Sequence, residues 1–274
     1  MSTRPSLELR GEILKLARVL WVEPESLAYL EKVSARDVRV LREKTVDALF
    51  GADEHLLRGI ADTAGSLPAS VSAKIARKAL GPVLSARVTG LIEPDRAVEL
   101  AGHLRPSFLA DIAVELDPRR AKGLLAKMPC DTIVEVSEEL ERRGEWVAMG
   151  RFLAHLPPAT VAAVVVTLSD ESLLHIAFVL DDKKRLDYVV ALLPAERHES
   201  VVLAAAEHGL WPEALDLMAH VKKKRRRELV AMAAAQDAKV LASLEKSVKA
   251  NGLEEELEAL IDLLPEEDRA GIGS

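Results

Sequence analysis

A short phrase, an apolar residue followed by a turn residue, returns every twelve positions between Leu80 and Pro194. It is interrupted once, because Leu140 and Leu156 stand 16 residues apart instead of 12. Within a unit the apolar side chains recur at offsets of three and four, which places them on one face of a helix. Proline near the second position suits the first helical turn, where its missing N–H costs nothing. The phrases are Leu80-Gly81-Pro82, Ile92-Glu93-Pro94, Leu104-Arg105-Pro106, Leu116-Asp117-Pro118, Met128-Pro129, Leu156-Pro157-Pro158, Leu168-Ser169-Asp170, Leu180-Asp181-Asp182 and Leu192-Leu193-Pro194.

Each unit therefore predicts one short helix followed by a tight turn. A helix of about two to three turns is unstable alone in water, so it must pack its apolar face on its neighbours. Two consecutive helices make a hairpin of 24 residues, and stacked hairpins make an α-solenoid. A β-strand would need alternation by two, and Val164-Val165-Val166 lies inside the helical period. We expect an all-α fold, a right-handed superhelical solenoid of short helices with irregular helices capping both ends.

Residues 1–66 are expected to form an irregular helical cap that hides the apolar flank of the first repeat. It begins with an amphipathic helix over 6–20, and Pro24 opens a second helix that ends near Val33. Ser34 and Asp37 have the spacing of a capping box, which predicts a third helix after Ser34.

The repeat domain is expected over 67–195, with a break near 141–155 where Gly144 interrupts the pattern. A C-terminal helical segment is expected over 196–274. Its apolar spacing predicts one long helix over 228–248. We therefore expect three parts, of which the middle one carries the repeat.

The helix punctuation of Leu116-Asp117-Pro118 and Leu156-Pro157-Pro158 resembles the cytoplasmic N-terminal domain of the MgtE magnesium transporter family. It is also similar to the middle region of the flagellar motor switch protein FliG, which shares that superhelical fold. The resemblance covers roughly residues 67–194, under half of the chain, and it concerns helix punctuation and no chemistry. Those transporters also carry paired nucleotide-binding CBS domains and a transmembrane domain. Neither can be recognised in this sequence. The resemblance implies a regulatory fold and a response to Mg²⁺.

Composition indicates a cytoplasmic protein. The 274 residues are 49% hydrophobic and 3% aromatic, so the core is expected to consist of Leu, Val and Ala. No apolar run reaches the roughly 18 residues that span a bilayer, which predicts no transmembrane segment, and residues 1–12 lack the apolar core of a signal peptide. Cys130, the only cysteine, stands beside Pro129 at an expected helix start, where a structural role is expected.

Six consecutive cations form the strongest local charge feature. They could neutralise phosphates of nucleic acid or of an anionic membrane. On a helix they spread around most of the circumference, and the whole chain is acidic, with a net charge of −7. A solvated turn or a partner-docking segment is the alternative. The candidate phosphate-binding residues are Lys222, Lys223, Lys224, Arg225, Arg226 and Arg227.

No motif of catalysis or of metal binding is present. The chain has no Gly-rich phosphate loop, no G-x-S-x-G and no H-x-x-x-H, and its seven histidines include no pair at i, i+3 or i, i+4. We therefore expect no enzyme, no catalytic residue and no zinc site. A weak Mg²⁺ site assembled across repeats is the one cofactor alternative, and only the family resemblance suggests it.

The two expected helices between Ala159 and Leu180 are unusually apolar. Helical projection predicts an inward stripe of Val161, Val164, Val165, Leu168, Leu173, Ile176 and Ala177. Val166, Leu174 and Phe178 then lie on a flank that ordinary units fill with smaller or polar residues. Either the terminal helices of the same chain cover this flank, or a second chain does. These three residues are the candidate partner surface.

A solenoid presents long surfaces and ordinarily works by binding. The first hypothesis is a non-enzymatic protein-interaction or regulatory scaffold in the cytoplasm, with a protein partner or self-association. A Mg²⁺-responsive regulator is one alternative. An adaptor that contacts nucleic acid or anionic lipid through residues 222–227 is the other.

Overall fold

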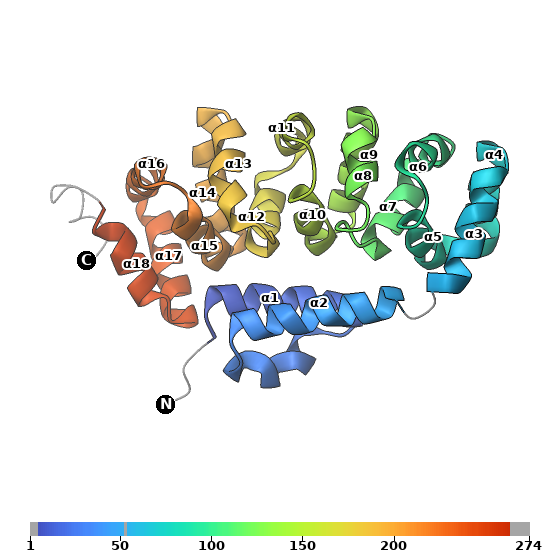
Figure 1. Cartoon of the computed structure of the whole chain (residues 1–274). Coiled ribbons are helices and arrows are strands. Elements are labelled where there is room, and N and C mark those ends of the chain that lie inside the picture. The colour runs from blue at the N-terminus through green and yellow to red at the C-terminus, as the bar shows by residue number, and fades with distance from the viewer. Residues whose placement is uncertain (1–4, 52–53, 264–274) are drawn as a thin grey trace. The chain divides into compact units, whose positions relative to one another are not determined.

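The computed structural model describes residues 5–51 and 54–263 (Figure 1). Every element in these residues is helical and none is a strand, so the all-α prediction is confirmed. The chain divides into two compact units. Unit 1 consists of Met1–Val38 with Leu168–Ser274, and unit 2 consists of Arg39–Thr167.

Unit 2 holds a regular succession of short helices, which follow one another from α3 to α11 in Figure 1. Helices two apart in the chain pack on each other: α3 on α5, α5 on α7, α7 on α9 and α9 on α11, beside a second row of α4, α6 and α8. Helix α2 is shared between the two units, since it begins in unit 1 and continues into unit 2. The elements are α2 (Ala35–Gly51), α3 (Glu54–Ser66), α4 (Ala69–Ile75), the π-helical turn η2 (Ala76–Leu80), α5 (Gly81–Thr89), α6 (Pro94–Ala101), α7 (Pro106–Glu115), α8 (Lys122–Lys127), α9 (Cys130–Arg142), α10 (Trp146–Leu153) and α11 (Pro158–Thr167).

Proline begins several of these helices as expected, since Pro94, Pro106 and Pro158 each occupy the first position of a helix. Pro118 is the exception, because the chain after it forms a turn and α8 starts only at Lys122. The Asp117 carboxylate accepts hydrogen bonds from the backbone N–H and the guanidinium of Arg119, at 3.0 and 3.1 Å. An aspartate that binds its own downstream backbone favours a turn over a helix.

The phrase at Leu80 also departs from the expected helix-turn-helix pattern. The turn η2 follows α4 directly and α5 follows η2 directly, so no loop separates them. Gly81 takes φ = +69° at this junction, a backbone conformation that costs glycine little because it has no Cβ.

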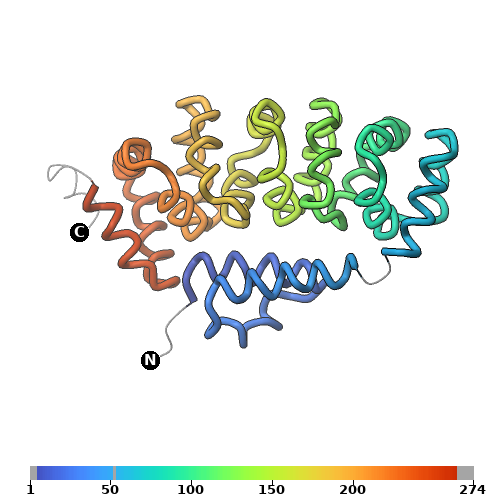
Figure 2. Tube along the Cα trace, viewed as in Figure 1, coloured from blue at the N-terminus to red at the C-terminus, as the bar shows by residue number. Residues whose placement is uncertain are grey.

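Unit 1 combines an N-terminal segment of the chain with a C-terminal one. Figure 2 traces its C-terminal helices, orange to red, as a series from α14 to α18. Here too α12 packs on α14, α14 on α16 and α16 on α18, beside a second row of α13, α15 and α17. The elements are α1 (Leu7–Leu20), the 3₁₀ helix η1 (Pro24–Lys32), α12 (Asp170–Val179), the 3₁₀ turn η3 (Lys183–Arg185), α13 (Leu186–Leu192), α14 (Ala195–His208), α15 (Trp211–His220), α16 (Lys223–Ala234), α17 (Ala238–Asn251) and α18 (Glu254–Ile261).

Helix α1 belongs to unit 1 and contacts helices of that unit. It packs on α12 and α15, far along the chain. A Cβ built at Gly11 would stand 3.2 Å from the carbonyl oxygen of Phe178, so glycine allows α1 to approach the end of α12 closely. Helix α1 therefore covers part of α12, which is the first of the two alternatives expected for the apolar segment 159–180.

The expected boundaries at 66 and 195 coincide with neither edge of the two units. Helix α3 packs on α5 across the first boundary, and α12 packs on α14 across the second. Within the expected break near 141–155, Gly144 takes φ = +70° in the turn between α9 and α10.

The long helix expected over 228–248 is two helices. Helix α16 ends at Ala234 and α17 begins at Ala238. The Asp237 side chain accepts a hydrogen bond from the N–H of Val240 at 2.9 Å, which caps the start of α17. The apolar spacing continues across this break, so the spacing alone does not indicate that one helix ends and another begins here.

The described helices include none that is both long enough and apolar enough to cross a membrane. The predicted inward stripe of α11 and α12 is buried, because all seven of its side chains are at most 7% exposed. The apolar periodicity therefore identified the core side of both helices correctly.

Candidate functional site

The basic run 222–227 lies at the beginning of α16 and is only partly exposed. Lys222, Lys223, Lys224 and Arg227 are exposed, whereas Arg225 and Arg226 are half-buried. The N-terminal end of a helix carries a partial positive charge. Cationic side chains are therefore unfavourable at this end, and the binding of an anion is favourable. Four exposed cations consequently surround an end of the helix that already favours anions.

Asp187 of α13 is the carboxylate that meets this run. The backbone N–H of Lys222 donates to Asp187 Oδ1 at 3.0 Å, and Lys222 Nζ lies 3.2 Å from Oδ2. The Arg225 guanidinium donates to the same carboxylate, and to the Asp187 carbonyl oxygen at 2.9 Å. Burial alone would raise the pKa of the Asp187 carboxyl, but the hydrogen bonds from Lys222 and Arg225 lower it below its usual value.

Arg226 also has a structural role. Its guanidinium donates to the carbonyl oxygens of Ala219 and Val221 at 2.7 and 2.9 Å, at the end of α15. Carbonyl groups at the C-terminal end of a helix need such donors. Arg225 and Arg226 therefore connect α16 to the rest of unit 1, and the exposed lysines and Arg227 are the part of the run that faces solvent.

The three residues of the candidate partner surface do not lie together on a surface. Val166 is 54% exposed on α11, but Leu174 is fully buried and Phe178 is 5% exposed on α12. Helix α12 packs on α1, α14 and α15 of its own unit. For Leu174 and Phe178 the structure therefore shows the first alternative, coverage by the same chain, which corrects their assignment to a partner surface.

A cluster of charged side chains joins α1 to the segment after α12 and to α15. Lys15 Nζ lies 2.6 Å from Glu12 Oε1 and 3.0 Å from Asp181 Oδ1. Lys183 Nζ lies 2.6 Å from Asp216 Oδ2, and the Asp216 side chain is 4% exposed. The sequence pattern placed Asp181 only within a repeat phrase and gave the other four residues no role.

Lys183 is held by three acceptors. Besides the Asp216 carboxylate, its ammonium donates to the carbonyl oxygens of Ala177 and Phe178 at 2.7 and 2.6 Å. Burial lowers the pKa of Lys183 below its usual value, and the attraction of Asp216 offsets part of that effect. An ammonium group has three N–H donors, so all three are engaged. This geometry makes Lys183 the cap of α12 and a cross-link between helices.

Just over half of the exposed large apolar side chains lie in the first part of unit 2. Fifteen such side chains are exposed in the part of the chain that the structure describes, and eight of them lie between Val40 and Leu84. The most exposed of the eight is Leu56 of α3, at 62%. We define the α3–α5 surface as Leu56, Val71, Ile75, Val83 and Leu84.

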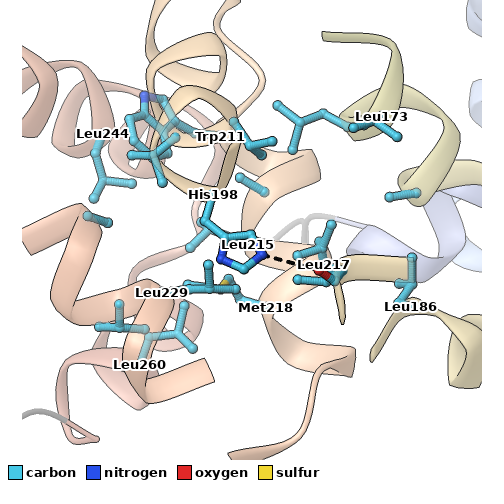
Figure 3. A pocket seen from close by; sticks show the side chains of 18 of the residues that line it. Leu173, Leu186, His198, Trp211, Leu215, Leu217, Met218, Leu229, Leu244 and Leu260 are labelled. Atoms are coloured by element: carbon cyan, nitrogen blue, oxygen red, sulfur yellow. Dashed lines mark hydrogen bonds between the residues drawn. The ribbon is translucent and has the colours of Figure 1, made fainter. Parts of the chain in front are cut away.

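An apolar cavity of about 100 Å³ lies inside unit 1 (Figure 3). Leucine, valine and alanine side chains from α12 to α18 make up most of its wall. Only two of the lining side chains carry nitrogen, His198 of α14 and Trp211 of α15. The indole N–H of Trp211 is used, because it donates to Ser243 Oγ at 3.0 Å.

The cavity exists because several positions of its wall carry small side chains. Alanine at inward positions contributes to it, as at Ala177, Ala214 and Ala233. Sequence reasoning missed the cavity. Its only local signal is this set of small residues on helices that otherwise carry leucine and valine.

Metal ligands are not gathered anywhere in residues 5–51 and 54–263, since no group of three or more His, Cys, Asp or Glu side chains there could hold an ion. His175 and His208 approach the Glu171 carboxylate, at 3.9 and 3.7 Å. Burial lowers the pKa of His175 below its usual value. Cys130 is half-buried at the first position of α9.

Comparison with protein-family models, with curated proteins and with solved structures gives no match to this chain. The side chains described above are therefore the basis for a functional inference.

Proposed function

We propose that this protein is a non-enzymatic helical-repeat scaffold of the cytoplasm that binds another protein through the α3–α5 surface of unit 2. The packing of helices two apart supports a solenoid, because hairpins stacked in order produce such rows. In this proposal the helices form a right-handed superhelix with a 12-residue repeat, as the resemblance to the MgtE N-terminal domain implies.

The exposure of the α3–α5 surface is the observation that carries the proposal. Single exposed apolar residues are ordinary on protein surfaces. Here five large aliphatic side chains are exposed on helices that pack together, since α3 packs on α5 and η2 packs on both α4 and α5. Val71 and Ile75 are four residues apart, which places them on one face of α4. Exposed apolar groups on neighbouring helices are typical of sites of protein interaction.

Leu56→Asp together with Val83→Asp is expected to abolish binding of the partner, or self-association, without unfolding the chain. Both side chains are exposed, at 62% and 48%, so each change should alter the free energy of unfolding by no more than about 0.5 kcal/mol. Partner capture from host cells measures binding, light scattering measures self-association, and a thermal melt measures stability.

Leu203→Asp is the matched control, because Leu203 is 42% exposed on α14 of unit 1. It introduces one negative charge, against two in the double variant, at a similar exposure outside the α3–α5 surface. Loss of the captured protein in the double variant and its retention in Leu203→Asp support the proposal. Equal capture by all three proteins would contradict it.

A second candidate function is the binding of nucleic acid or anionic lipid through the basic run, and the four exposed cations at the beginning of α16 favour it. Under this alternative, Lys222→Gln with Lys223→Gln and Lys224→Gln is expected to weaken binding and to lower the slope of log K against log salt by up to about 3 for duplex DNA. Filter binding for DNA and RNA and vesicle flotation for anionic lipid measure this at several salt concentrations.

The matched triple variant replaces the exposed Lys239, Lys246 and Lys249 of α17 by glutamine. It removes the same net charge from unit 1. Equal weakening by both triple variants would show that only net charge matters, and absence of binding at low salt would remove this alternative.

A further inference from the structure

The cavity of unit 1 is lined by apolar side chains that are far apart in sequence, and it is partly open to solvent. Leu174 and Ala177 contribute from α12, Trp211 and Leu215 from α15, and Leu244 from α17. Leu174, Ala177, Trp211, Leu215 and Leu244 are each at most 7% exposed. A wall of such side chains offers water few hydrogen-bond partners, so an apolar occupant is favoured. An apolar cavity of ~150 Å³ in another protein, for example, binds benzene or xenon.

Two side chains of the wall carry nitrogen, and the Trp211 N–H is already bonded to Ser243. Among the described residues none forms a hydrogen bond with Nδ1 of the other, His198. Its Nε2 lies 3.1 Å from the carbonyl oxygen of Val190. A carbonyl oxygen only accepts, so Nε2 carries the proton, and in the neutral ring Nδ1 is then an acceptor. Figure 3 shows the imidazole among the apolar side chains of the cavity, with the bonded nitrogen turned toward that carbonyl and the other on the opposite side of the ring.

We propose that this cavity binds a small alcohol or phenol whose apolar body fills the space and whose hydroxyl group donates a hydrogen bond to His198 Nδ1. The volume of about 100 Å³ limits the apolar body to about one six-membered ring or a short alkyl chain. The cavity lies in unit 1, so this site is independent of the α3–α5 surface.

Phenol and toluene test the proposal on the full chain, because they have the same size and differ in one hydroxyl for one methyl. Phenol is expected to raise the melting temperature by mass action and to bind about threefold to tenfold more tightly than toluene, as one hydrogen bond predicts. Calorimetric titration measures the affinities. The indole N–H resonance of Trp211 locates the ligand, since Trp211 lines the cavity.

Two variants separate the space from the hydrogen bond. Ala214→Leu fills part of the cavity and is expected to abolish binding of both compounds, and Ala233→Leu does the same from α16 if the first variant does not fold. His198→Leu removes the acceptor and is expected to equalise the affinities for phenol and toluene.

Four results would overturn the proposal. They are no binding of either compound to the unaltered chain, equal binding of both to it, undiminished binding in a folded cavity-filling variant, and a persistent preference for phenol in His198→Leu.

Discussion

Asp216→Ala is expected to lower the free energy of unfolding by about 3 to 5 kcal/mol. The Asp216 carboxylate lies 2.6 Å from Lys183 Nζ, and the two side chains are 4% and 16% exposed. Without it, the Lys183 ammonium keeps only its two carbonyl acceptors in a place where a charge is poorly solvated. Urea unfolding followed by circular dichroism gives the free energy directly.

Asp95→Ala is the matched control for this prediction. Asp95 pairs with Lys127 at 2.7 Å, nearly the same distance, but the two side chains are 83% and 49% exposed. An exposed pair of this kind is worth roughly 0 to 1 kcal/mol. The pair of variants therefore compares the same chemistry in a buried and in an exposed setting. Similar small losses in both would mean that the cluster around Lys183 does not stabilise unit 1.

Leu174→Asp is expected to destabilise the chain by about 4 kcal/mol or more, because it removes a core side chain and buries a carboxylate in an apolar wall. Leu174 is fully buried on α12. Val166→Asp introduces the same charge on α11, where the side chain is 54% exposed, and is expected to change stability by no more than about 0.5 kcal/mol. Thermal melts and denaturant titrations of both variants measure the difference.

Val166 is the one exposed residue of the candidate partner surface. Light scattering and partner capture on Val166→Asp test whether it lies in an interface. Loss of an oligomer or of a partner with unchanged melting would place an interface at α11. Unchanged mass and unchanged capture would remove Val166 from any interface. A large drop in the melting temperature of Val166→Asp would contradict the exposure of this residue.

Helix positions followed from local chemistry and could be predicted from the sequence. Pro94 and Pro106 begin helices because the first turn does not use their missing N–H groups. Ser169 begins α12 because its hydroxyl accepts from the N–H of Ser172 at 3.2 Å. The apolar spacing of three and four then identified the buried sides of α11 and α12.

Local chemistry also explains the failures of prediction. The apolar spacing runs through the junction of α16 and α17, but the Asp237 side chain caps a new helix there. Pro118 has the composition of a helix start, but Asp117 binds the backbone of Arg119 and forms a turn. In both places one aspartate hydrogen bond outweighed the pattern, and its partner was a nearby backbone N–H group.

The candidate sites could not be predicted in this way, because they join residues that are distant in the sequence. Lys15 and Asp181 are separated by 166 positions and yet lie 3.0 Å apart. The apolar stripe of α12 required a cover, but periodicity carries no information on which helix supplies it, and in the structure α1, α14 and α15 pack on α12.

The sequence by itself determined the all-helical class, several of the helix starts and the buried faces of α11 and α12, because these depend on backbone hydrogen bonds and side-chain spacing within a few residues. Only the tertiary structure decided that Leu174 and Phe178 are covered by their own chain, that Arg225 is paired with Asp187, and that small residues leave a cavity beside His198. Burial and pairing are properties of the packed arrangement, and the free energy of each depends on which neighbours the fold brings near.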